Sequence, residues 1–313
     1  MPDPDLTEVA ESVRARIAQG ESGTDACRLF HGRGRAYAGL NALVIDRYGD
    51  TLRVGLHERW SQAAVGRLAD VLRAECVPAG INGAWLQWRG EVGAPCEVLF
   101  GEPQSQLVVY EEGLAHQVRP GEARNAGLFL DARPARRWLR NHAAGRRVLN
   151  LFAYTCAFSL AALAGGARAV VNVDMVRSTL VTGQRNHALN GFKDAQFLPH
   201  NIWKSSSALR KRGPFDVVVL DPPSFQRGSF EANRDWPRLF ARLGDWCAPG
   251  GDVLLLVNSP LIDRGQLDAW RSAWAPGFAA SGEVCASPDF PESEPERGLK
   301  ILCWRRVRAA ESA

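Results

Sequence analysis

The sequence predicts an α/β protein in which a doubly wound, largely parallel sheet follows a small α+β domain. From about Gly121 onward, aliphatic strand candidates alternate with helical segments of ten or more residues, and such alternation is typical of βαβ units on a sheet covered on both faces. Residues 26–118 instead contain short alternating stretches separated by turns. We therefore expect an N-terminal segment (1–25), a small α+β domain (26–118) and a larger domain (119–313).

Composition limits the class of protein. A chain of 313 residues is long enough for two domains. Its content of 46% hydrophobic and 23% charged residues is typical of globular proteins. A net charge of +4 does not by itself indicate nucleic acid. The seven cysteines show no CxxC pair or zinc spacing, and no signal peptide or membrane-length apolar run is present. We expect a soluble cytoplasmic protein with free thiols, no metal and no membrane segment.

In the small domain, residues 42–56 alternate around a Gly-Asp turn and predict a hairpin, and residues 61–76 have helical periodicity. In the larger domain, six aliphatic segments predict strands, namely 147–152, 169–174, 195–201, 216–221, 252–257 and 299–306. Ligands of doubly wound sheets bind at the carboxyl ends of the strands. The residues that follow each strand are therefore the candidates for function.

Three strand ends carry small or polar residues. The first strand is followed by Ala153, Thr155 and Cys156, which are small but are not the glycines of a nucleotide loop, so a plain turn is an equal alternative. Asp174 ends the second strand and suits the hydroxyl groups of a ribose, or alternatively caps the next helix. Asn201 follows the third strand and suits the edge of an adenine, or serves as a turn residue.

The fourth strand ends in an unusual cluster, FDVVVLDPPSF (215–225). Two prolines fix two φ angles and remove two backbone donors, which leaves rigid carbonyls able to accept hydrogen bonds. With the carboxylate of Asp221 and the ring of Phe225, the cluster suits a flat group that carries hydrogen-bond donors. The alternative is a simple stop before a helix.

Five motifs occur in an order that resembles the class I S-adenosylmethionine-dependent methyltransferases. They are GLFLDARPARRWL (127–139), VLNLFAYTCAFSLAALAGGA (148–167), VNVDM (171–175), NHALNG (186–191) and DPPSF (221–225). Together they resemble the bacterial 23S rRNA enzymes that act on carbon 5 of cytosine and on N7 of guanine. RLFHG (28–32) and ALVIDRYGD (42–50) are similar to the small domain that precedes the catalytic domain there. The resemblance implies a Rossmann-like methyltransferase sheet and S-adenosylmethionine as the cofactor.

The resemblance also implies roles for individual residues. The residues expected to bind the cofactor are Phe129, Asp131, Arg133, Asn150, Phe152, Tyr154, Thr155, Asp174, Met175, Asn201, Ile202 and Asp221. The residues expected to face the target base are Asp221, Pro222 and Phe225, and a stacked aromatic ring is worth about 1–3 kcal/mol per base.

The chain departs from the family pattern at three places. Cys156 replaces a glycine and is expected to narrow the space for the cofactor, and Asn201 replaces an aspartate. The sequence Asn258-Ser259-Pro260 stands where the cytosine enzymes have a nucleophilic cysteine. Carbon 5 of cytosine is activated by a thiolate that adds to carbon 6, whereas a base nitrogen needs only positioning. We therefore expect methylation of a guanine or another base nitrogen.

The expected partner is RNA, either 23S rRNA or a large-subunit precursor. Six arginines lie between Arg133 and Arg147, and of these Arg136, Arg137 and Arg140 are predicted to contact phosphates near the catalytic mouth. A second basic group is Lys204, Arg210, Lys211 and Arg212, and a third is Arg33 and Arg35. Ordinary solvated helix faces are the alternative. The target base is expected in single-stranded or splayed RNA.

Two other functions remain open on the sequence alone. One is methylation of a small molecule or a protein. The other is a non-catalytic RNA-binding protein whose cofactor site has decayed, which Cys156 and Asn201 would explain.

Overall fold

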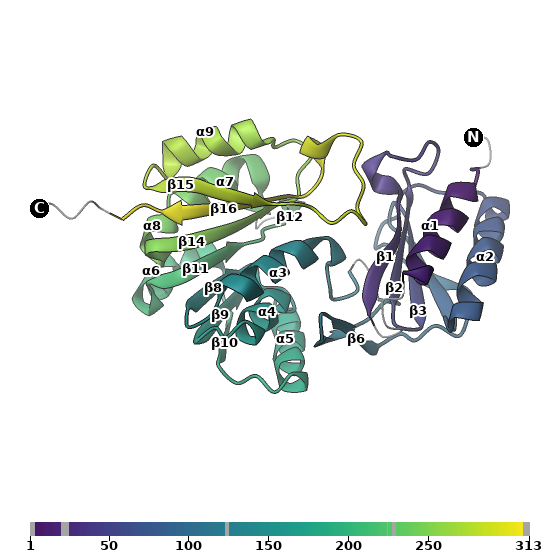
Figure 1. The fold of residues 1–313 in the computed structure, drawn as a ribbon, viewed down its shortest axis with the longest axis horizontal. Helices are drawn as coiled ribbons and strands as arrows, with labels where there is room; N and C mark the ends of the chain where they lie inside the picture. Colours follow the sequence, from purple (N-terminus) through teal and green to yellow (C-terminus); the bar gives the residue numbers. More distant parts are fainter. Residues whose placement is uncertain (1–3, 20–24, 123–124, 224, 227–229, 309–313) are drawn as a thin grey trace, which may run out of the picture. The chain divides into compact units, whose positions relative to one another are not determined.

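The computed structural model describes residues 4–19, 25–122, 125–223, 225–226 and 230–308, without the side chains of residues 225 and 226 (Figure 1). The chain forms two units. The first runs to Asp131 and includes Ser287–Ser293, and the second comprises Ala132–Ala286 and the residues from Glu294 onward. The division falls at Asp131 rather than at residue 118. The first unit also contains helix α1 (Thr7–Ala18), which lies in the segment expected to precede the small domain.

The first unit is built on a five-stranded sheet in the order β1-β2-β3-β4-β5. Its strands are β1 (Ala26–His31), β2 (Leu43–Tyr48), β3 (Thr51–Leu56), β4 (Gly83–Trp88) and β5 (Cys96–Gly101). The predicted hairpin is β2–β3, and its turn uses Gly49 at φ 62°. The predicted helix is α2 (Gln62–Cys76), capped by Ser61, whose hydroxyl accepts from the backbone N–H of Ala64 at 3.1 Å. A second hairpin, β6 (Leu107–Glu111) with β7 (Leu114–Val118), completes the unit.

The charged loop after residue 286 contributes Ser287–Ser293 to the first unit. The ring of Phe290 lies 4.5 Å from the guanidinium of Arg28 and 5.2 Å from the ring of His31. The backbone N–H of Ser293 donates to the carbonyl of Gly34 at 2.8 Å. Any Cβ at position 34 would lie 1.7 Å from the carbonyl oxygen of Pro291, so this approach requires glycine.

The second unit contains a seven-stranded sheet in the order β10-β9-β8-β11-β14-β16-β15. Its strands are β8 (Arg147–Leu151), β9 (Ala169–Asp174), β10 (Ala195–Pro199), β11 (Phe215–Leu220), β14 (Cys247–Val257), β15 (Phe278–Val284) and β16 (Lys300–Arg306). The first five in the sheet are parallel, and β16 is antiparallel to both β14 and β15. The six predicted strands are present. Strand β15 was missed because most of this edge strand is exposed, so no alternation of apolar residues marks it.

Helices cover both faces of this sheet, which confirms the doubly wound class (Figure 1). Helices α3 (Arg133–His142) and α4 (Ala157–Ala164) pack on the face that includes Val148, with α5 (Arg177–Leu189) beside α4. The other face, which includes Leu149, is covered by α6 (Ile202–Arg212), α7 (Ala232–Phe240), α8 (Leu243–Trp246) and α9 (Arg264–Trp274). No described helix has both the length and the apolar character that a membrane span requires.

Candidate functional site

The parallel strands bring the predicted site residues of the second unit to one edge of the sheet. Leu151 at the end of β8 is in register with Val173 of β9 and with Leu220 of β11. The loop after β8, the Asp174 carboxylate and the Asp221-Pro222 segment therefore follow neighbouring strands. We call this side of the sheet the carboxyl edge.

The loop after β8 is wound tightly by left-handed residues. Phe152, Tyr154 and Cys156 have φ of 59°, 48° and 65°, although none is glycine. The N–H of Ala153 donates to the carbonyl of Val173 at 3.0 Å, and the N–H of Cys156 donates to the carbonyl of Ala153 at 2.7 Å. Left-handed backbone costs roughly 1–2 kcal/mol for an ordinary residue, and such strain clusters at functional sites.

Asp174 fixes this loop to the second strand. One carboxylate oxygen accepts from the N–H of Tyr154 at 2.9 Å, and the other accepts from the N–H of Val176, just before α5, at 2.8 Å. Asp174 therefore fixes the backbone just before α5, but it is not the cap of that helix, which was the alternative interpretation, because the N-cap residue is Val176. A carboxylate has about four acceptor positions, so both oxygens retain capacity for ribose hydroxyls. That role stays a prediction.

A chain of buried polar side chains lies beneath the loop, and only its first member was a sequence candidate. Asn150 Nδ2 donates to Asn172 Oδ1 at 2.8 Å, and Asn172 Nδ2 donates to Ser159 Oγ at 3.0 Å. Ser159 Oγ contacts His187 Nε2 at 2.8 Å, and His187 Nδ1 contacts the carbonyl of Gly183 at 2.7 Å. Because a carbonyl can only accept, Nδ1 carries the proton, and Nε2 accepts from the serine hydroxyl. Burial lowers the pKa of His187, which agrees with this neutral form.

One hydrogen-bond acceptor at the end of this series of polar side chains has no partner among the described residues. Asn150 Oδ1 is buried and has no hydrogen-bond partner among the described residues. Asn150 is the penultimate residue of β8, beside the carboxyl edge. A buried acceptor of this kind favours a ligand that carries an N–H group, because a buried acceptor without a hydrogen bond costs about 1–3 kcal/mol.

Cys156, which is expected from the sequence to narrow the space for the cofactor, has its side chain against α5. It is fully buried and packs with Ala153 and Leu180. A Cβ added at Gly183 of α5 would lie 2.5 Å from the Cys156 sulfur. The missing side chain at Gly183 therefore provides the space for the thiol between α4 and α5, so the sulfur points into the helical layer.

The remaining cofactor candidates occupy several environments. Asn201 Oδ1 accepts from the N–H of Trp203 at 2.9 Å and caps α6, which leaves its amide nitrogen as the group suited to an adenine acceptor. The side chain of Ile202 packs in the core, whereas Met175 is exposed and Thr155 is buried. Phe129 and Asp131 belong to the first unit, so their part in the cofactor site stays a prediction.

The proline cluster follows β11 as expected. Asp221 is half-buried and Pro222 is buried, while Ser224 and the side chain of Phe225 fall outside the described part of the chain. The short strand β12 (Phe225–Gln226) pairs with β13 (Phe230–Glu231). The ring of Phe230 packs edge-on against Phe152 at 5.5 Å, an aromatic contact that no sequence motif indicated.

A buried lysine supports the segment after β14. Lys300 Nζ donates to the carbonyls of Ser259 at 3.1 Å, Glu296 at 2.6 Å and Gly298 at 3.0 Å. These contacts fix the Asn258-Ser259-Pro260 segment against the start of β16. No sequence motif indicated this role, because Lys300 resembles an ordinary strand-end lysine.

The predicted RNA-binding arginines of α3 do not form one exposed group near the catalytic mouth. Arg136 is buried, with its guanidinium 5.8 Å from the centre of the Phe158 ring. Arg136 lies on the buried face of α3 together with Ala135 and Leu139, which are separated by one turn of the helix. Arg137 is exposed, and Arg133, at the start of α3, is half-buried.

Arg140 lies at the opposite edge of the sheet. A Cβ at Gly165, which follows α4 and precedes β9, would lie 2.0 Å from the carbonyl oxygen of Arg140. Arg146 and Arg147 also lie there, at the start of β8. The helix runs from one edge of the sheet to the other, so its arginines are separated along its length.

Comparison with known proteins assigns the class. A family model described as S-adenosylmethionine-dependent methyltransferase matches residues 27–305. The chain therefore belongs to this family, which confirms the fold and the cofactor class that the motifs predicted.

Among curated relatives, the chain is similar to ribosomal RNA large subunit methyltransferase I of Aeromonas hydrophila, with 32% identity over 255 residues, or 75% of this chain and 64% of the relative. It is also similar to ribosomal RNA large subunit methyltransferase K/L of Pseudomonas aeruginosa, with 33% identity over 268 residues, or 80% of this chain and 35% of the relative. The chain thus spans less than two thirds of these relatives. A Streptococcus mutans structure described as a SAM-dependent methyltransferase superposes with a TM-score of 0.81 at 23% identity, covering 97% of this chain and 82% of that one.

Proposed function

We propose that the chain transfers a methyl group from S-adenosylmethionine to a base nitrogen, most naturally of guanine, in large-subunit ribosomal RNA in the cytoplasm. The observation that carries this proposal is the carboxyl edge, where Asn150 near the end of β8, Asp174 at the end of β9 and Asp221 just after β11 lie on neighbouring strands without a reactive cysteine among them. The relatives named above are large-subunit ribosomal RNA methyltransferases, which supports the substrate. A structural neighbour with a TM-score of 0.86 is described as complexed with SAH, which supports the cofactor.

The residues at this edge fit the cofactor. Asp174 is suited to accept from the ribose hydroxyls, and the buried Asn150 Oδ1 is suited to accept from the amino group of the methionine part. Asn201 is suited to the adenine edge. When bound, S-adenosylmethionine supplies an electrophilic methyl group on its sulfonium. The intact hydrogen bonds of Asp174 to the loop argue against a decayed cofactor site.

The cysteines favour nitrogen as the methylated atom. Cys156 lies near the carboxyl edge, but its sulfur is buried, and burial raises its pKa well above 9.0. Burial also raises the pKa of Cys247 and of Cys303 to about 12. Cys285 is exposed but follows β15, which is three strands from β11, or roughly 14 Å at the usual strand spacing. None of these thiols is placed to add to a cytosine held at Asp221.

Asp221 and the carbonyls of the two prolines are suited to hold the base. Their acceptors match the N–H groups of a guanine edge, and a rigid segment keeps the target nitrogen in line with the methyl group. Positioning of this kind can account for much of the rate, because small misplacements at a reacting centre cost on the order of a hundredfold.

The test is methylation of deproteinised 23S rRNA with isotopically labelled S-adenosylmethionine, followed by mass spectrometry of the nucleosides. We expect the label in an N-methylated base, and little label with an Asp221→Ala variant that still binds the cofactor. Label in 5-methylcytidine would overturn the nitrogen assignment. Label in protein or small molecules but not in RNA would favour the rival substrate classes.

A further inference from the structure

A second basic surface lies at the edge of the sheet opposite the carboxyl edge, where the parallel strands begin. Strand β16 is antiparallel to β14 and therefore ends at this same edge. We call this surface the amino-edge basic face. It consists of exposed or half-buried side chains from four places in the chain, namely Arg146, Arg147, Arg168, Arg210, Lys211, Arg212, Arg305, Arg306 and Arg308.

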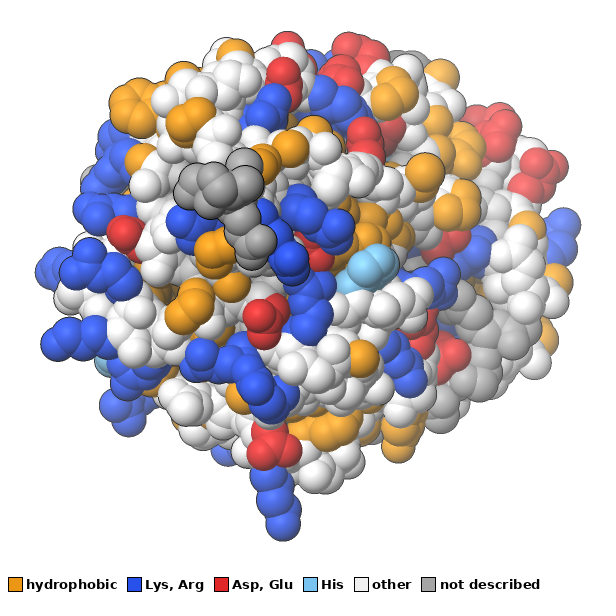
Figure 2. Space-filling model, turned by 60° about the vertical axis from the view of Figure 1, so that its left-hand side comes forward, with side chains coloured by type: hydrophobic (Ala, Val, Ile, Leu, Met, Phe, Trp, Pro, Cys, Tyr) orange, Lys and Arg blue, Asp and Glu red, His pale blue; other side chains and the backbone are white. Residues whose placement is uncertain are grey.

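The acids at this edge, which include Asp194, Asp216, Asp245 and Asp252, are fewer than its nine basic side chains. Asp252 is buried and is shared by two arginines, since it accepts from Arg146 Nη1 at 2.7 Å and from Arg305 Nε at 2.8 Å. Asp216 accepts from the backbone N–H of Arg147 at 2.8 Å. In Figure 2, Lys and Arg side chains gather on the part of the surface that lies at the left of Figure 1, where β16 ends. Crowded like charges of this kind are stabilised by a bound polyanion.

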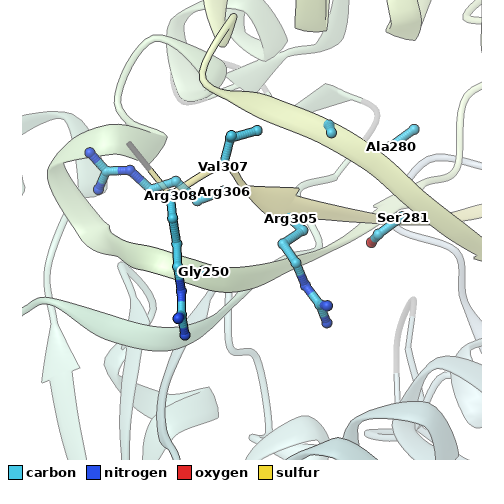
Figure 3. Close-up of a pocket in the computed structure, with 8 residues that line it drawn as sticks. Gly250, Ala280, Ser281, Arg305, Arg306, Val307 and Arg308 are labelled. Atoms are coloured by element: carbon cyan, nitrogen blue, oxygen red, sulfur yellow. The ribbon is translucent and has the colours of Figure 1, made fainter. Parts of the chain in front are cut away.

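Part of this face is hollowed. A cavity of about 430 Å³ is lined by the arginines of the β16 end, together with Gly250 and the small residues of β15, as Figure 3 shows for Ala280 and Ser281. The guanidinium of Arg306 is held by the carbonyls of Gly244 and Cys247, and that of Arg305 is held by a carboxylate. Arg305 and Arg306 are successive residues of β16, so their guanidinium groups are held on opposite faces of the sheet, beside the small residues of β15. Pre-oriented arginines bind phosphates with less loss of side-chain entropy.

Structural roles at the ends of helices and strands account for only some of the basic residues of this face. Basic side chains at the carboxyl end of α6 interact favourably with the helix dipole, which accounts for Arg210, Lys211 and Arg212. Arg147 donates to the carbonyls of Pro214 and Arg212, which links β8 to the start of β11. Neither explanation applies to the exposed Arg168 and Arg308.

The face lies well away from the proposed site of methylation. Strands β8 and β11 have five and six residues, and a rise of about 3.3 Å per residue places the two edges roughly 20 Å apart. A strand stacked at about 3.4 Å per nucleotide needs roughly six nucleotides to reach from Asp221 to the amino edge. An RNA that contacts both edges therefore extends several nucleotides beyond the methylated base.

We propose that the amino-edge basic face binds the phosphate backbone of a folded RNA at nucleotides remote from the methylated base. The inference rests on the proposed function, and it adds that the substrate is a large structured RNA rather than a short single strand. Contacts to phosphates position an RNA without reading its sequence, so the face would contribute affinity and orientation while the carboxyl edge selects the base.

The test compares a triple variant, Arg168→Gln with Lys211→Gln and Arg308→Gln, against wild type in RNA binding across a salt series. These side chains come from three of the four places that form the face, and none belongs to the proposed catalytic edge. The control variant removes the same charge from the helices of the first unit, with Arg14→Gln, Arg67→Gln and Arg73→Gln. The RNAs are deproteinised 23S rRNA and a short single-stranded oligonucleotide.

For 23S rRNA, the slope of log affinity against log salt should fall by between about 2 and 3 in the triple variant, since each lost phosphate contact is worth roughly 0.7–0.9. The control variant should keep the wild-type slope, and oligonucleotide affinity and cofactor binding should not change. An unchanged slope in the triple variant, or an equal fall in the control, would overturn the inference. Loss of binding to anionic lipid vesicles with an unchanged rRNA slope would do the same.

The failure of the proposed function is a separate outcome, because it is measured by methylation. A wild-type protein that labels 23S rRNA while the triple variant keeps the full salt slope contradicts only the amino-edge inference. A wild-type protein that labels no RNA contradicts the proposed function.

Discussion

Replacement of Gly183 by alanine tests how α5 accommodates the cysteine in the loop. In an ordinary helix interior, glycine to alanine stabilises by about 1 kcal/mol. Here the new Cβ would lie 2.5 Å from the Cys156 sulfur and 3.1 Å from its Cβ, in a fully buried position. Overpacking of a core typically costs about 1–3 kcal/mol. We therefore expect Gly183→Ala to reverse the usual sign and to lower the free energy of unfolding.

The reasoning is tested by a double-mutant cycle with Cys156→Ala, followed by urea denaturation. Removal of the sulfur removes the shortest contact, so Gly183→Ala should become close to neutral in the Cys156→Ala background. The coupling energy between the two positions should be about 1–3 kcal/mol, as for residues in direct contact. If Gly183→Ala stabilises the wild-type protein, or if the two changes are additive, the thiol does not lie between the helices and the account of this loop fails.

Four further outcomes follow from individual contacts. Asp174→Ala should weaken S-adenosylmethionine binding by about 1.5–3 kcal/mol in titration calorimetry, whereas Asp194→Ala, an exposed acid before β10, should have no effect. Lys300→Met leaves three carbonyls without their donor and should cost at least about 2 kcal/mol of unfolding free energy, so an unchanged urea midpoint would contradict the contacts. Burial alone raises the pKa of Asp252, but hydrogen bonds from Arg305 and Arg146 outweigh burial and lower this pKa below 3.8. The contribution of Asp252 to the free energy of unfolding should therefore be present above pH 4 and be lost on further acidification, and Asp252→Asn should flatten the pH dependence of stability below pH 4. Burial, with neighbouring arginines, lowers the pKa of His31 from 6.5 to about 3, so stability should fall as the pH drops through that interval, and less steeply in His31→Gln.

The resemblance and the strand pattern predicted the class of fold and the sheet edge at which Asp174 and Asp221 lie. Asp174 and Asp221 could be assigned to one edge from sequence because parallel strands all end on the same side of a sheet. The hairpin at residues 42–56 was equally predictable, since its turn depends on local backbone preference at Gly49. The edge strand β15 was not, because an exposed strand of small residues has no apolar alternation.

What only the tertiary structure decided was how side chains far apart in the chain meet. The arginines of α3 look like one cluster in sequence, but the helix turns Arg136 into the core and carries Arg140 to the opposite edge. The Cys156 sulfur occupies the space that the missing side chain of Gly183, far along the chain, leaves open. The side chain of Lys300 is held by carbonyls at three separate positions, and the charge of the amino edge is assembled from α6, β8, β16 and the turn before β9. Local sequence sets the backbone of each element, whereas these contacts depend on the packing of one element against another, which no single stretch of residues specifies.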